Sequence, residues 1–211
     1  MLPSGWPRIR HTDAVYSRWL ALTALSYAVL HHLGLLPDGL GSGPDDTRWT
    51  DWIDLAVPWV VLVPAALTLR ADRAAERTWW VFGAGALAYA SGHGIHLAAN
   101  SVGNAHPSDT AHLWDEVVGH AIWYAGVALV LLALARTMVG RPRAGWVGYL
   151  LAVAVGLTWA SNALGGGTQV LAAVVAVIAC GFGWRHRREL PVVLLVGFAP
   201  VIPVLLAVWA C

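Results

Sequence analysis

The sequence predicts an all-α integral membrane protein with seven transmembrane helices, on the basis of its composition, its apolar segments and its arginine distribution. Hydrophobic residues make up 58% of the 211 residues, and charged residues only 12%, about half of what soluble domains carry. Seven apolar stretches of roughly 17–25 residues fit in the chain, and about 20 such residues cross a bilayer. We therefore expect one polytopic membrane domain over residues 1–211.

The predicted helices follow one another with short connections. Their approximate ranges are 15–36, 52–69, 79–101, 113–135, 145–163, 168–184 and 190–210. Arginines precede the first range, as in a signal peptide, but that range is long and lacks an A-x-A motif, so we expect it to be retained. Prolines predict bends in the second helix (Pro58, Pro64) and in the last (Pro200, Pro203).

The arginines predict the orientation of the chain in the membrane. The sequence contains no lysine, and twelve of its thirteen arginines fall before or at the start of the first helix, or in every second connection. Only Arg48 lies in one of the other connections. Because positive residues favour the cytoplasmic side, we expect a cytoplasmic N-terminus and an extracytoplasmic C-terminus. We expect a multi-pass protein of a bacterial plasma membrane.

Two function classes are excluded by the basic residues. The arginines form short clusters at helix ends, without the basic groove and interleaved aromatics of a nucleic-acid-binding protein. A retinal Schiff base of the rhodopsin kind requires a lysine, which the chain does not contain.

Seven of the nine histidines lie near the predicted outer ends of the first four helices. These are His31, His32, His93, His96, His106, His112 and His120. Ionisable groups at membrane depth are costly, and they usually face a bundle interior and mark a functional site. The clustering on one side therefore predicts a polar site there.

Helical spacing places several of these residues on common faces. His93, His96 and Asn100 follow an i, i+3, i+7 pattern in the third helix. His112, Glu116 and His120 follow i, i+4, i+8 in the fourth, with Asp115 beside them. Residues of the two helices that are equally far from a loop centred near His106 should lie at the same depth in the bundle. This pairs His96 with Glu116, His93 with His120, and Asn100 with His112. Gly92, Gly94 and Gly119 should allow the two helices to approach closely.

Imidazoles and carboxylates that project into a helical bundle are typical ligands of zinc, iron, copper or manganese. We expect a metal site formed by residues of four helices: His31, Asp54, His93, His96, Glu116 and His120. Glu116, His120 and Asp115 are the expected catalytic acid and base groups. Outer hydrogen-bonding partners would orient the ligands, and we assign this role to His32, Asn100 and His112.

The function that this pattern favours is an integral membrane enzyme, a metal-dependent hydrolase or oxidoreductase. Its site would face outward, and its substrate would be a lipid or another hydrophobic small molecule. A haem- or copper-handling membrane protein is an alternative, as are a metal-free acid–base isomerase or cyclase and a proton-coupled transporter. The inner halves of the third and fourth helices offer few polar residues for a continuous proton pathway, which disfavours the transporter.

Overall fold

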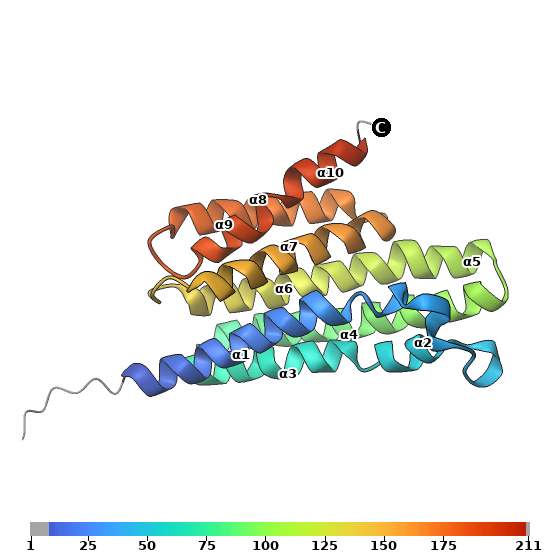
Figure 1. Cartoon of the computed structure of the whole chain (residues 1–211), viewed down its shortest axis with the longest axis horizontal. Helices are drawn as coiled ribbons and strands as arrows, with labels where there is room; N and C mark the ends of the chain where they lie inside the picture. Colours follow the sequence, from blue (N-terminus) through green and yellow to red (C-terminus); the bar gives the residue numbers. More distant parts are fainter. Residues whose placement is uncertain (1–8, 210–211) are drawn as a thin grey trace, which may run out of the picture.

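The structure, a computed structural model, describes residues 9–209, which form an all-helical bundle (Figure 1). Its long helices run back and forth along one axis: α1 Ile9–Leu30, α3 Val57–Asp72, α4 Glu76–Ala105, α6 His120–Met138, α7 Trp146–Gly165 and α8 Gln169–Arg185. The final stretch comprises α9 Val192–Phe198 and α10 Val201–Trp209. Within the described residues no β-strand forms. The all-helical prediction is confirmed.

Three helical stretches of the described residues are long and apolar enough to cross a membrane. They are Trp49–Asp72, Asp109–Met138 and Trp146–Gly165. Two further apolar helices, Gln169–Arg185 and Val192–Ala207, are shorter. α1 and α4 have the necessary length but carry more polar residues. Large apolar side chains are exposed along these helices, as on Trp80 and Leu87 of α4, which suits a protein surrounded by lipid.

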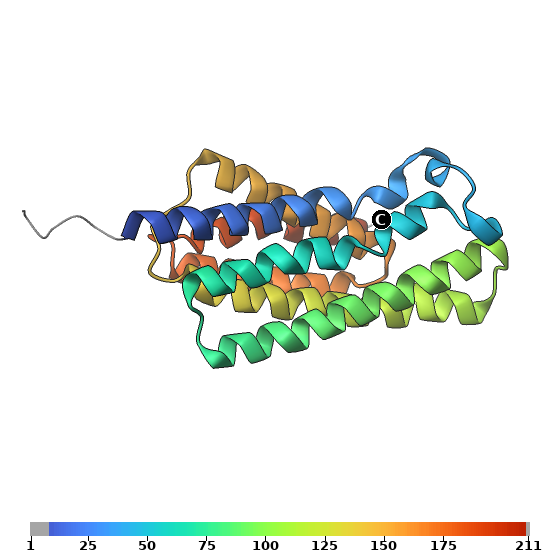
Figure 2. The same cartoon turned by 90° about the horizontal axis from the view of Figure 1, so that it is seen from below.

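The first connection differs from the prediction. α1 ends at Leu30 instead of continuing to residue 36, so His31 and His32 lie just beyond the helix. Short turns follow: η1 Leu33–Leu35, η2 Pro37–Leu40, η3 Pro44–Asp46 and α2 Trp49–Asp54. The backbone of Asp38, Leu40 and Asp45 is left-handed, a conformation that ends helices. These turns form a cap over one end of the bundle (Figure 2).

Pro58, Pro64 and Pro200 affect their helices in different ways. Pro58 lies in the first turn of α3, where a helix makes no use of the missing N–H. The break therefore precedes it, at Leu55 and Ala56, and separates α2 from α3. Pro64 lies inside α3 without dividing it. Pro200 separates α9 from α10, as predicted.

Glycines bring α4 and α6 into close contact. A Cβ atom added at Gly92 would overlap the main chain of Trp123, and one at Gly119 would overlap the main chain of His96. Gly85 and Gly126 make the same kind of approach further along the two helices. The predictions for Gly92 and Gly119 are confirmed. Gly94 has open space around it, so the prediction for that residue was wrong.

An arginine network ties the opposite end of the bundle together. Arg141 donates to Asp13 Oδ1 at 2.7 Å and to Asp72 Oδ1 at 2.6 Å, and its guanidinium lies 3.6 Å from the centre of the Tyr16 ring. It therefore links α1, α3 and the connection after α6. The connections that carry most of the predicted cytoplasmic arginines meet at this end. Arg8 lies outside the described residues.

Candidate metal site

The candidate site lies at the end of the bundle opposite the Arg141 network, where α4 meets the segment that leads into α6. The connection between the two helices is short, because α4 extends to Ala105 and α5 (Asp109–His112) begins soon after. Ser108 caps α5 by accepting a hydrogen bond from the Ala111 N–H at 3.1 Å, a common role of serine at the start of a helix.

A π-helical segment, η4 Leu113–Gly119, joins α5 to α6. In an α-helix Asp115 and His120, five residues apart, would lie about 140° apart around the axis. The i→i+5 bonding of a π-helix widens the turn, so that the two residues come close to the same face. Asp115 is thereby placed beside His120 and opposite His96 of α4.

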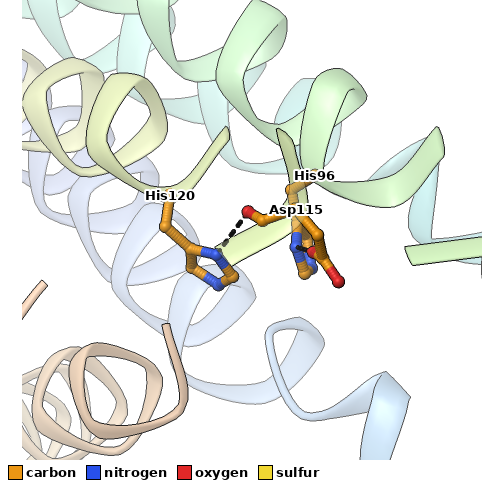
Figure 3. A group of neighbouring side chains, drawn as sticks. All are labelled: His96, Asp115 and His120. Atoms are coloured by element: carbon orange, nitrogen blue, oxygen red, sulfur yellow. Dashed lines mark hydrogen bonds and ion pairs between the residues drawn. The ribbon is translucent and has the colours of Figure 1, made fainter. Parts of the chain in front are cut away.

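Asp115 orients both imidazoles (Figure 3). Its carboxylate Oδ1 accepts a hydrogen bond from His96 Nδ1 at 2.5 Å, and its main-chain carbonyl accepts one from His120 Nδ1 at 2.9 Å. A neutral histidine that donates through Nδ1 has an unprotonated Nε2. Both rings therefore present a lone pair at Nε2. A hydrogen bond from the second ring nitrogen to a carboxylate or carbonyl is the usual arrangement around a metal-binding histidine.

His96, Asp115 and His120 can hold a metal ion. One nitrogen of each imidazole and one carboxylate oxygen lie within 4.8 Å of one another. Two ligand atoms bound to the same zinc ion lie at most about 4.4 Å apart, given metal–ligand distances of about 2.0–2.2 Å. For the group to close around an ion, the Asp115 carboxylate would exchange its hydrogen bond with His96 Nδ1 for a bond to the metal. His120 is buried, and the side chains of His96 and Asp115 are 19% and 13% exposed.

Glu116 lies beside this group, facing a groove. Its Oε2 lies 3.7 Å from His120 Nδ1 and is buried without a hydrogen-bond partner among the described residues. The groove between η4 and the α7–α8 turn is lined by Glu116, His112 and Thr168. The side chain as a whole is 32% exposed. Glu116 therefore connects the three candidate ligands with the surface.

His93, a predicted ligand, is held by a different partner. Pro58 has no N–H to offer the Asp54 carbonyl four residues earlier, and His93 Nε2 donates to that carbonyl at 3.1 Å. The Asp54 carboxylate lies 3.4 Å from the same nitrogen. Nδ1 of His93 is buried without a hydrogen-bond partner among the described residues. His93 and Asp54 therefore join α4 to the α2–α3 break, outside the group of three.

His31, unlike His93, has both ring nitrogens engaged in hydrogen bonds. Nδ1 donates to the Tyr27 carbonyl at 3.0 Å, and Nε2 accepts from the Tyr89 hydroxyl at 2.7 Å. Its ring stacks on Trp123, with centroids 5.4 Å apart, and the ring of His96 also stacks on Trp123, with centroids 5.5 Å apart. His31 thus supports the site through Trp123 and does not join the three candidate ligands.

The three predicted outer partners lie apart from the ligand group. His32 Nε2 bonds with Thr158 Oγ1 at 3.1 Å and ties the end of α1 to α7. Asn100 accepts from Asn104 at 3.3 Å, within α4. His112 is exposed at the groove. The two imidazoles of the ligand group contact the Asp115 carboxylate and main-chain carbonyl instead.

The predicted depth pairing of the two helices is shifted. Gly119, not Glu116, lies opposite His96, and Trp123, not His120, lies beside His93. The prediction centred the turn near His106, whereas α4 continues to Ala105 and the turn follows it. This displacement moves every residue of the fourth predicted helix outward relative to α4.

Two residues of the site were missed in the sequence. Gly166, in the α7–α8 turn, packs so closely on His120 that any side chain there would overlap the imidazole ring. The run of glycines at 165–167 was the available signal, since such runs permit close backbone approach. Tyr89, which donates to His31, has no comparable signal in an otherwise apolar stretch.

No family model, curated protein or solved structure matches this chain.

Proposed function

We propose that the protein is an integral membrane metalloenzyme that acts on a lipid or another hydrophobic small molecule. The observation that carries the proposal is the group formed by His96, Asp115 and His120, whose ligand atoms lie within 4.8 Å of one another. Two histidines and one carboxylate are the donor set of many catalytic zinc sites and of non-haem iron oxygenases, both of which keep coordination positions open. Copper and manganese are less well matched to this set.

The surroundings of the group support catalysis over a purely structural role. A structural zinc site is closed by four protein ligands, whereas three are gathered here. A metal ion in this position would activate a bound water molecule or carry redox chemistry. Glu116 would exchange protons with the substrate, because its Oε2 is close to His120 and its side chain lines the groove. In this proposal Asp115 is a metal ligand and Glu116 is the acid–base group.

The length of α4 supports a position of the group near one boundary of the bilayer. α4 contains 30 residues and is about 45 Å long, which exceeds the roughly 30 Å of a hydrocarbon core. With Glu76 at the arginine-rich boundary, the opposite boundary falls close to His96. A substrate held by the membrane and a water molecule from outside both have access to that level.

Metal content tests the proposal directly. Protein purified in mild detergent without chelators should carry about one equivalent of zinc or iron per chain, measured by elemental analysis. Protein that is metal-free, and that gains no thermal stability from added zinc, iron, copper or manganese, would contradict it, since a bound ligand stabilises by mass action. An intense visible absorption band would instead favour the haem- or copper-handling alternative.

The seven-span topology is part of the same proposal. The helices at all seven predicted ranges support it, as does the arginine asymmetry. A reporter fused after Cys211 should be extracytoplasmic, and one inserted at residues 137–145 should be cytoplasmic, in a bacterial plasma membrane. Detection of both reporters on the same side would end the seven-span interpretation and the outward orientation of the site.

A further inference from the structure

A partly open, mainly apolar cavity lies in the described bundle, away from the histidines. Its volume is about 410 Å³, and it lies between α1, α4, α6, α7 and α9. The α1 residues that line it run from Asp13 to Tyr27 and are spaced so that they share one face of the helix. The α7 residues that line it run from Val147 to Trp159 and likewise share one face. We call this space the tunnel. It is distinct from the groove beside Glu116, with which it shares no lining residue.

The tunnel is long. Its lining on α1 runs from Asp13 to Tyr27, fourteen positions further along, which corresponds to about 21 Å of helix. An apolar space of this length suits one extended hydrocarbon chain.

The walls of the tunnel are apolar along its length. Leu20 and Ala24 of α1 face Leu131 of α6 and Leu151 of α7 across it. An apolar cavity of this kind stays dry and binds apolar ligands. The ring of Tyr89 and that of Tyr27 close the end nearest the histidines, and Tyr89 is the residue that donates to His31.

The opposite end opens at a charged mouth. Arg141 pairs there with two carboxylates, those of Asp13 and Asp72. Arg143 is exposed and donates only to the main-chain carbonyl of Arg187, at 2.6 and 3.0 Å, so within the described residues no carboxylate pairs with it. The start of α7, at Gly145 and beyond, lines the same mouth, and the positive end of a helix also favours an anion.

From this combination we infer that the tunnel binds a long-chain fatty acid. The hydrocarbon chain lies between α1, α6 and α7, and the carboxylate lies at the mouth beside Arg143. A guanidinium and a carboxylate form strong charge-assisted hydrogen bonds. The inference rests on the tunnel and its mouth alone, and it holds whether or not the histidine site binds metal.

Palmitate binding tests the inference. The full chain is placed in phosphatidylcholine nanodiscs, and radiolabelled palmitate is titrated and then displaced with unlabelled palmitate. Saturable binding of about one palmitate per chain is expected, above the level in empty nanodiscs. Ala24→Phe narrows the tunnel and should weaken binding more than about tenfold. Ala14→Phe, an exposed position of the same helix, is the matched control and should bind as the wild type does.

The carboxylate is tested separately from the chain. Arg143→Gln should weaken palmitate binding by about tenfold and leave the binding of hexadecanol unchanged. Leu20→Phe provides a second narrowing variant, for use if Ala24→Phe melts at a lower temperature than the wild type. Absence of saturable binding, or wild-type binding by the folded narrowing variants, would overturn the fatty-acid site. An equal effect of Arg143→Gln on both probes would overturn the role of the charged mouth. None of these variants should change the metal content.

Discussion

Replacement of His96 or His120 by alanine should abolish the proposed metal binding. Each change deletes one of two nitrogen ligands in a group of three. Loss of even an outer hydrogen-bonding partner lowers metal affinity by about 10–100-fold, so loss of a ligand should lower it by more than about 100-fold. Asp115→Asn should have a similar effect, because it replaces the charged carboxylate, which contacts His96, with a neutral amide that is a weaker metal ligand. Elemental analysis of the purified variants measures the result.

Two neighbouring residues provide matched controls for this experiment. His112→Ala changes an exposed histidine of the same hairpin and should leave the metal content at the wild-type level. Glu116→Gln should also retain the metal, because Glu116 lies outside the ligand group, and it should abolish turnover if Glu116 acts as the acid–base group. Retention of metal by Asp115→Asn together with its loss in Glu116→Gln would show that the two carboxylates have exchanged roles.

The helical content could be predicted because the bundle is built from long apolar segments with short connections. Each predicted range overlaps a helix of the structure. The prediction extended the first helix too far, since the apolar residues 33–36 look helical but belong to turns with left-handed residues after them. Hydropathy reports burial in lipid or protein and does not distinguish a helix from an apolar turn that caps a bundle.

The candidate site could be located from the sequence, but its membership could not. Clustered histidines at one end gave the location, and His96 and His120 were among the predicted ligands. The prediction assumed regular α-helical spacing, which put Glu116 on the face of His120 and left Asp115 at its edge. The π-helical segment at Leu113–Gly119 reverses that order. An inserted π turn follows from tertiary packing, and hydrophobic periodicity does not reveal it.

The roles of His93 and Asp54 could not be predicted from the sequence either. Their spacing in the sequence carries no sign that a proline at position 58 frees the Asp54 carbonyl and that His93 satisfies it. Buried carbonyls must find a donor, so a histidine near a proline-interrupted helix has a structural use that competes with metal binding. Only the three-dimensional arrangement decides between these uses.

Gly92→Ala should destabilise the protein strongly and should also weaken the metal site. A Cβ atom at this position would overlap the main-chain nitrogen and Cα of Trp123 and the carbonyl of Gly119. Main-chain atoms in a packed helix do not rotate away, so α4 and α6 would have to separate. We expect a loss of about 3 kcal/mol, at the upper end of the range for overpacking. His96 and Asp115 face each other across the same contact, and their separation should reduce the metal content.

Gly94→Ala is the matched control, because it makes the same chemical change two residues away on the same helix. No atom lies within 4 Å of the added Cβ there, and alanine is favoured over glycine inside a helix by about 0.5–1 kcal/mol. Gly94→Ala should therefore melt at or slightly above the wild-type temperature and keep its metal. Thermal unfolding of the two variants in one detergent, each with and without added zinc, makes the comparison. Equal melting temperatures would show that α4 and α6 separate at little cost, and the close contact would then no longer explain how His96 and Asp115 are held together.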